Sequence, residues 1–226
     1  MSYSFSKAEM HDLPAVLSAP RFATFLRATA NKRADALALY QWNLPVSAAM
    51  FVPLHLCEIA LRNGVAEALQ RVHGANWPWS AGFVRSLPVP RNRYNYNAQA
   101  DLTRVARRQS TTGKVIAQLR FAFWQQLFTA GQDQRLWLPH LRSVFPGVPA
   151  NLSVAATRAL TYRNIYEVRS LRNRIAHHEP IFARDLASEH ARLREMIAWR
   201  SGTAAAWLDR VEGVTALLGT KPVAGS

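Results

Sequence analysis

The sequence predicts an all-α protein that folds as a single-domain helical bundle. Strand signals are nearly absent, because no segment sustains an alternation of apolar and polar residues and no Asn-Gly turn joins two apolar runs. The chain is rich in Ala, Leu and Arg, which are good helix formers. Its 226 residues are 49% apolar and include 7 Trp and 10 Phe, which is enough to build a core.

The first third of the chain predicts two helices. A proline opens a short helix over residues 20–30, because proline fits the first helical turn. A longer helical region covers residues 33–71, and His73-Gly74 ends it. Within this region Pro45 and Pro53 must break or kink the helix, since proline lacks an N–H and clashes with the preceding turn.

The middle of the chain divides into shorter pieces. Three prolines and a glycine make residues 77–90 a turn-rich connection. Residues 92–108 form either a basic helix or an ordered loop. Residues 115–128 predict one strongly apolar helix, and residues 132–145 predict a shorter helix that Pro139 interrupts.

The last third predicts three helices after a break at residues 146–149, where two prolines flank a Gly-Val pair. The expected helices cover residues 151–177, 185–200 and 203–218. From residue 219 to residue 226 a disordered tail is expected.

Cysteine usage and hydropathy predict a soluble cytoplasmic protein with no membrane contact. The single Cys57 excludes an intramolecular disulfide, fits a reducing compartment and is expected to be a small core residue. The N-terminus lacks the apolar segment of a secretory signal. The longest apolar run, residues 44–57, contains two prolines and falls short of the roughly 20 residues of a membrane span.

The net charge of +14 favours polyanionic partners, nucleic acid above all. An Arg-rich, Ala-rich composition also fits a biased genome, so the distribution of charge is more informative. Between residues 68 and 132 the only acidic residue is Asp101. Cations interleaved with aromatics suit a surface that binds RNA, the alternative being a solvated face. The candidate RNA-binding residues are Arg91, Arg93, Tyr94, Tyr96, Arg104, Arg107 and Arg108.

Residues 171–182, with the sequence LRNRIAHHEPIF, combine two adjacent histidines with arginine and asparagine. Arginine matches phosphate oxygens with a permanently charged fork, and histidine gives and takes a proton near neutral pH. The segment therefore predicts a phosphate-handling site. Its candidate catalytic residues are Arg172, Asn173, His177 and His178.

Helix geometry divides these candidates. A rotation of about 100° per residue places Arg169, Asn173 and His177 on one face of a helix. Arg172 lies five residues before His177 and therefore well off that face. Arg172 and His177 converge only if the last helical turn is distorted or if another chain completes the site.

The paired histidines also fit a purely structural role at the end of a helix. The helix should end near His178, because Pro180 disfavours the α conformation of the residue before it, and histidines near a helix C-terminus can be capping groups. The zinc pattern His-Glu-x-x-His fails, because Phe182 stands where the second histidine is needed. Neither a Gly-x-Ser-x-Gly nucleophile nor a Gly-rich phosphate loop is present, so no metal and no cofactor are expected.

The pattern Arg172-Asn173-x-x-x-His177 resembles the signature of the HEPN superfamily, and the longer string is similar to its Abi-like (abortive infection) branch. Other segments are similar to that family in the same order, and the resemblance covers residues 34–199. These segments are Tyr40-Gln41-Trp42-Asn43, Glu58-Ile59-Ala60-Leu61-Arg62-Asn63, and Phe121-Ala122-Phe123-Trp124 followed by Leu136-Trp137.

The resemblance implies one domain over residues 1–226, a HEPN-type bundle with extra N-terminal helices in residues 1–30 and a basic insertion. The break at residues 146–149 is then a loop, because the resemblance runs across it. HEPN proteins are typically dimers whose motif helices meet, so a homodimer with a composite site is expected. The tryptophans and phenylalanines of the similar segments are expected in the core.

The function implied is metal-independent cleavage of RNA by its own 2′-OH, in phage defence or as the toxin of a toxin–antitoxin pair. His177 would be the general acid or base, Arg172 the phosphate clamp, Asn173 a hydrogen-bonding partner and His178 an assistant. The pair Glu58 and Arg62, with Asn63 beside it, is expected to support the site by lining the motif pocket. The partners implied are RNA, a second copy and a possible antitoxin protein or RNA.

Two alternatives stand beside the ribonuclease. One is a non-catalytic HEPN module that binds RNA or protein. The other is a purely structural helical protein, which leaves the twelve residues of the motif unexplained.

Overall fold

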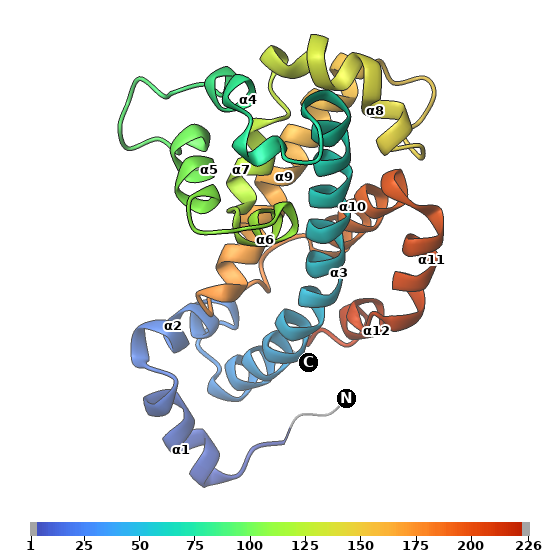
Figure 1. The fold of residues 1–226 in the computed structure, drawn as a ribbon. Helices are drawn as coiled ribbons and strands as arrows, with labels where there is room; N and C mark the ends of the chain where they lie inside the picture. The colour runs from blue at the N-terminus through green and yellow to red at the C-terminus, as the bar shows by residue number, and fades with distance from the viewer. Residues whose placement is uncertain (1–3, 223–226) are drawn as a thin grey trace.

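The computed structural model describes residues 4–222, and within them the protein is a single compact all-α structure with twelve α-helices and no strand (Figure 1). The predicted fold class is confirmed at this level. The helices are α1 (Lys7–Val16), α2 (Ala19–Ala28), α3 (Arg33–His73), α4 (Ala81–Ser86), α5 (Ala98–Ala106), α6 (Thr112–Gln118), α7 (Phe121–Gln126), α8 (Leu138–Val144), α9 (Val154–Ala176), α10 (Leu186–Arg200), α11 (Gly202–Val211) and α12 (Val214–Leu218).

The long helix α3 organises the fold. Figure 1 shows α4 to α7 on one side of it and α10 to α12 on the other, and α3 packs directly on α2, α8, α9 and α10. Pro45 and Pro53 lie inside this 41-residue helix, which continues through both. The axis turns between its first and second halves in Figure 1, so the predicted kink is present and the predicted break is not.

Two expected helices are each divided in the structure. The residues 115–128 belong to α6 and α7, because Leu119 and Arg120 adopt extended backbone, with ψ of 135° and 147°. The extended pair buries Leu119 between the two short helices, so tertiary packing overrides the local helical pattern. The C-terminal helix divides at Glu212-Gly213, where the Glu212 carboxylate accepts a hydrogen bond from the Thr215 N–H at 3.1 Å and so caps α12.

Helix α1 agrees with the extra N-terminal helices expected in residues 1–30, although its own bounds were not predicted. Its first turn is fixed by a capping box, in which the Glu9 N–H donates to the Ser6 hydroxyl at 3.2 Å and the Ser6 N–H donates to the Glu9 carboxylate at 2.7 Å. Pro139 was expected to interrupt a helix over residues 132–145. In the structure a π-helical turn covers Asp133–Trp137, and Pro139 lies in the first turn of α8, which begins at Leu138.

The core is aromatic, as expected. Trp77 lies 6.3 Å from both Phe123 and Trp124 between ring centroids, and Phe128 stacks on Trp137 at 4.3 Å. Cys57 is buried, which confirms the prediction that it is a core residue. Burial raises the pKa of its thiol to about 12.

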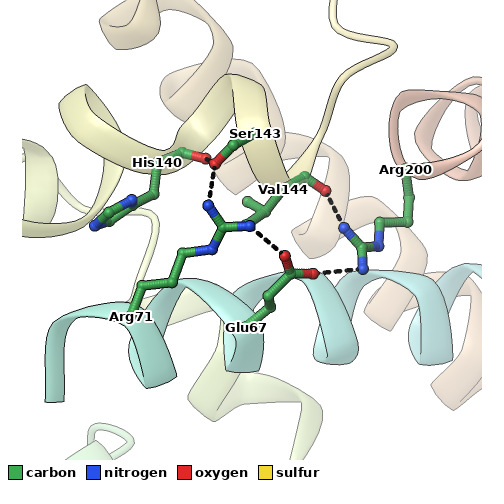
Figure 2. A network of polar contacts seen from close by, with 6 residues as sticks. All are labelled: Glu67, Arg71, His140, Ser143, Val144 and Arg200. Carbon is green, nitrogen blue, oxygen red and sulfur yellow. Dashed lines mark hydrogen bonds and ion pairs between the residues drawn. The ribbon is translucent and has the colours of Figure 1, made fainter. Parts of the chain in front are cut away.

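A polar cluster on one flank joins three helices (Figure 2). The two oxygens of Glu67 on α3 accept from Arg71 at 2.6 Å and from Arg200 of α10 at 2.7 Å. Arg71 also donates to the Ser143 hydroxyl at 3.1 Å, and Arg200 donates to the Val144 carbonyl at 2.6 Å. We call these residues the Glu67 cluster; it fastens α8 and α10 to α3.

The apolar character of α3 also meets the length and composition of a membrane-spanning helix, with a mean hydropathy of 1.7 over its most apolar window. The core helix of a soluble protein meets the same criteria. The cytoplasmic location therefore stays a prediction. Of the tail expected at residues 219–226, residues 223–226 lie outside the described residues, and the Lys221 ammonium donates to the Phe182 carbonyl at 2.7 Å.

Candidate active site

Helix α9 ends in a tight backbone motif at the paired histidines. His177 is the C-cap residue of α9. The N–H of His178 donates to the Ile175 carbonyl at 2.9 Å, and the N–H of Glu179 donates to the Arg174 carbonyl at 2.8 Å. This is the Schellman arrangement, which needs a left-handed residue at its turn. His178 supplies it with φ of 57°, a conformation that costs about 1 kcal/mol for a residue with a side chain. The predicted end of the helix near His178 is confirmed.

The segment that leaves the helix is pinned from two other helices. The Ile181 N–H donates to the side-chain oxygen of Asn43, an α3 residue that is only 8% exposed, at 2.9 Å. The Phe182 ring packs on Phe25 of α2, with centroids 4.9 Å apart. Arg21, also on α2, donates to the His178 carbonyl at 3.2 Å. The end of α9 therefore has one defined geometry.

An open hollow of about 300 Å³ lies along this end of α9. We call it the motif hollow; it is lined by Tyr166, Arg169, Ser170, Asn173, Arg174, His177 and Glu179. The face expected from helical spacing, with Arg169, Asn173 and His177 together, is therefore present. Arg172 and His178 are exposed and do not line the hollow, and Arg172 donates to the Asn173 side-chain oxygen at 3.3 Å.

Both arginines of the motif hollow are held by neighbours. Arg169 donates through Nη1 to the side-chain oxygen of Gln125 on α7. Arg174 donates through Nη2 to the Pro180 carbonyl at 3.0 Å, and its Nη1 lies 3.4 Å from a Glu179 oxygen. An imidazole, an amide and two fixed guanidiniums thus share one solvent-accessible surface, which is the chemistry needed to bind an anion and move a proton beside it.

The supporting residues expected from the resemblance lie elsewhere. Arg62 forms an ion pair with Glu58 and donates to the carbonyls of Ile116 and Ala117 at 3.4 and 3.2 Å. These are carbonyls of the last turn of α6, so the pair fixes α6 on α3. Neither residue is among those that line the motif hollow, and Asn63 is exposed on α3.

The candidate RNA-binding residues lie in the loop before α5, on α5 and in the turn directly after it. A second hollow, of about 440 Å³, is lined by Gln99, Ala100, Thr103, Arg104, Arg107 and Arg108. We call it the α5 hollow. In the loop, Arg91, Arg93 and Tyr94 are exposed; the Tyr94 ring is 80% exposed, with the Arg93 guanidinium 5.0 Å from its centre.

Tyr96 differs from the other candidates, because its hydroxyl is already used. It donates to Asp101 at 2.7 Å, and Asp101 is only 6% exposed and also pairs with Arg104. Burial raises the pKa of Tyr96, Asp101 raises it further, and the nearby Arg120 and Arg169 act against the rise. Tyr96 is thus a structural residue. Helix α7 packs on both α5 and α9, so the α5 region and the motif helix share a neighbour.

Within residues 4–222, no three side chains among His, Cys, Asp and Glu stand close enough together to hold a metal ion. No protein-family model, no curated protein and no solved structure matches the chain.

Sequence reasoning assigned no role to Gln125, Tyr166 or the side chain of Asn43. Gln125 and Asn43 act across helices, on Arg169 and on Ile181, and such contacts leave no periodic trace in the sequence. Tyr166 had a usable signal. It lies seven residues before Asn173, two helical turns away on the same face, so it could have been placed with the motif.

Proposed function

We propose that the protein is a metal-independent endoribonuclease of the HEPN, Abi-like type. The observation that carries the proposal is the motif hollow, where His177 and Asn173 stand beside a fixed guanidinium on an open surface. A shallow, solvent-accessible, cationic hollow suits a polyanionic chain better than a small molecule, which is usually enclosed in a mostly apolar pocket. The ordered motifs of the sequence favour the same class.

The reaction is an internal transesterification of RNA. The 2′-oxygen forms a bond to the adjacent phosphorus and gives up its proton, while the bond to the 5′-oxygen breaks and that oxygen takes a proton. The products are a 2′,3′-cyclic phosphate and a 5′-hydroxyl. His177 moves one of the two protons, and Asn173 donates a hydrogen bond to a phosphate oxygen.

A second copy of the chain completes this site in the proposal. Arg172 is exposed and lies off the motif hollow of its own chain, so it is free to reach the hollow of a partner across a two-fold axis. There it stabilises the negative charge of the transition state, and His178 of the same turn assists proton transfer. A homodimer is therefore part of the proposed active form.

The deciding experiment is RNA cleavage by the purified protein in excess EDTA, with His177→Ala beside the wild type. The proposal expects cleavage by the wild type alone, with products that end in 2′,3′-cyclic phosphates. Equal cleavage by both proteins, or cleavage by neither across structured and unstructured RNA, would exclude it.

The biological setting that follows is defence against phage or the toxin role of a toxin–antitoxin pair, with an antitoxin protein or RNA as regulator. The second candidate function is a non-catalytic RNA-binding module, and the α5 hollow favours it. Three arginines there offer contacts to an RNA backbone without any acid–base group, and Tyr94 is exposed in the loop before α5. RNA binding that depends on the α5 arginines and is unchanged by His177→Ala would support this second function.

A further inference from the structure

The two arginines of the motif hollow differ in how much of each guanidinium is left for a ligand. Arg174 uses Nε and Nη2 on the Pro180 carbonyl, at 3.3 and 3.0 Å, and Nη1 faces Glu179. Arg169 makes one hydrogen bond within residues 4–222, from Nη1 to Gln125. Its Nε and Nη2 therefore remain for an anion in the hollow.

Gln125 is built to hold that guanidinium. It is 2% exposed on α7, and its amide nitrogen donates to the Tyr162 carbonyl on α9 at 3.1 Å. Because the nitrogen is used on a carbonyl, the amide oxygen must face Arg169. A buried amide with both ends occupied keeps Arg169 in one orientation before any ligand arrives, which reduces the entropy lost on binding.

We propose that Arg169 is the anion-binding residue of the motif hollow, that its ligand is a phosphate of single-stranded RNA, and that Gln125 positions it. The choice of an RNA phosphate rests on the proposed function. The free edge of an arginine fork matches two phosphate oxygens. Asn173 lies one helical turn further along α9, about 6 Å, so a phosphate on Arg169 is within reach of the motif.

A chain of contacts links Arg169 to α5. Gln125, the hydrogen-bond partner of Arg169, lies on α7, and α7 packs on both α5 and α9. Arg172 does not line the motif hollow and serves the partner copy in the proposed function.

The test uses binding in place of turnover. A fluorescein-labelled oligouridylate with 2′-O-methyl sugars cannot be cleaved, and its anisotropy reports binding to the full chain. Arg169→Ala is expected to weaken binding roughly tenfold or more and to lower the slope of log affinity against log salt by about 0.7. Arg169→Lys should recover part of the affinity. Arg210→Ala, which removes the same charge from an exposed position on α11, is the matched control and should change neither quantity.

The positioning role of Gln125 is tested by a double-mutant cycle. Gln125→Leu alone should weaken binding severalfold, and it should add nothing in the Arg169→Ala background, because its effect passes through Arg169. Additive losses would mean that Gln125 only supports packing, and circular dichroism of each variant separates misfolding from lost binding.

The outcomes distinguish this inference from the proposed function. Wild-type affinity and salt slope in folded Arg169→Ala would overturn the inference even if the wild type cleaves RNA. Binding that depends on Arg169, with no cleavage of unmodified RNA by the wild type, would support the anion site and remove the ribonuclease proposal.

Discussion

Arginines in the Glu67 cluster and arginines at the α5 hollow have opposite environments. In the cluster, Arg71 and Arg200 share the carboxylate of Glu67 and each reach a second acceptor, so their charge is partly offset and their geometry is fixed (Figure 2). At the α5 hollow, Arg107 and Arg108 are exposed and have no carboxylate partner within residues 4–222. The location of the few acidic residues therefore decides which arginines are structural and which remain available.

The motif hollow lies between these extremes. Arg169 is held by a neutral amide, which fixes its position and leaves its charge intact. A carboxylate in place of Gln125 would fix the side chain and cancel the charge. We therefore expect paired arginines to stabilise the fold, exposed arginines to add to RNA affinity, and the amide-held arginine to be preorganised for an anion.

The largest effect is expected at the motif hollow. His177→Ala should reduce RNA cleavage by at least about 100-fold, because the proton transfer is lost, and should leave the affinity for the 2′-O-methyl oligouridylate unchanged. His140→Ala on α8 is the control, since its ring makes no hydrogen bond within the described residues and α8 lies away from the hollow. Cleavage that survives His177→Ala would move the chemistry to another site.

Neutralising the exposed pair should be the next effect in size. Arg107→Ala with Arg108→Ala is expected to weaken binding of the oligouridylate roughly tenfold at low salt and to lower the salt slope by about 1.4, because two phosphate contacts are lost. The midpoint of thermal unfolding should not change. A lowered midpoint with normal affinity would reverse the assignment and make these arginines structural.

The cluster should give the opposite result. Arg200→Ala removes the donor to Glu67 and to the Val144 carbonyl, and we expect the free energy of unfolding to fall by about 1 kcal/mol with no change in RNA affinity. Urea titration of Arg200→Ala beside Arg107→Ala provides the matched comparison, because each variant loses one positive charge.

The smallest effect concerns pH. The hydrogen bond from Arg71, assisted by Arg200, holds the pKa of Glu67 below its usual 4.5, against the effect of burial. A lowered pKa in the folded state contributes stability above the unfolded pKa, and this contribution is lost as the pH falls through the folded value. Glu67→Gln should therefore be less stable than the wild type at pH near 7, and urea titrations should show the two converging in acid. A constant difference across pH would contradict the ionic origin.

The sequence predicted those features that depend on local pattern. The all-α class, the extent of α3 and α9 and the shared face of Arg169, Asn173 and His177 all follow from helical periodicity. The division of residues 115–128 into two helices could not be predicted, since it depends on burying Leu119 against other helices.

The partners of charged residues were also beyond prediction. The spacing of Glu58 and Arg62 predicted their ion pair correctly, but only the packing of α6 on α3 shows which carbonyls the arginine reaches. Gln125 belongs to an apolar segment and gives no sign of its hydrogen bond to Arg169, forty-four residues later. Such contacts between distant side chains depend on how the helices pack, and they leave no periodic pattern in a single sequence.

The segment that follows the paired histidines depends on residues from the far end of the described chain. Trp42 donates to the Leu217 carbonyl at 2.8 Å, and Lys221 donates to the Phe182 carbonyl at 2.7 Å. The contact at Phe182 thus comes from a residue 39 positions later in the sequence. Truncation before Leu217 would therefore loosen the segment that leaves the motif helix without removing any residue of the motif itself.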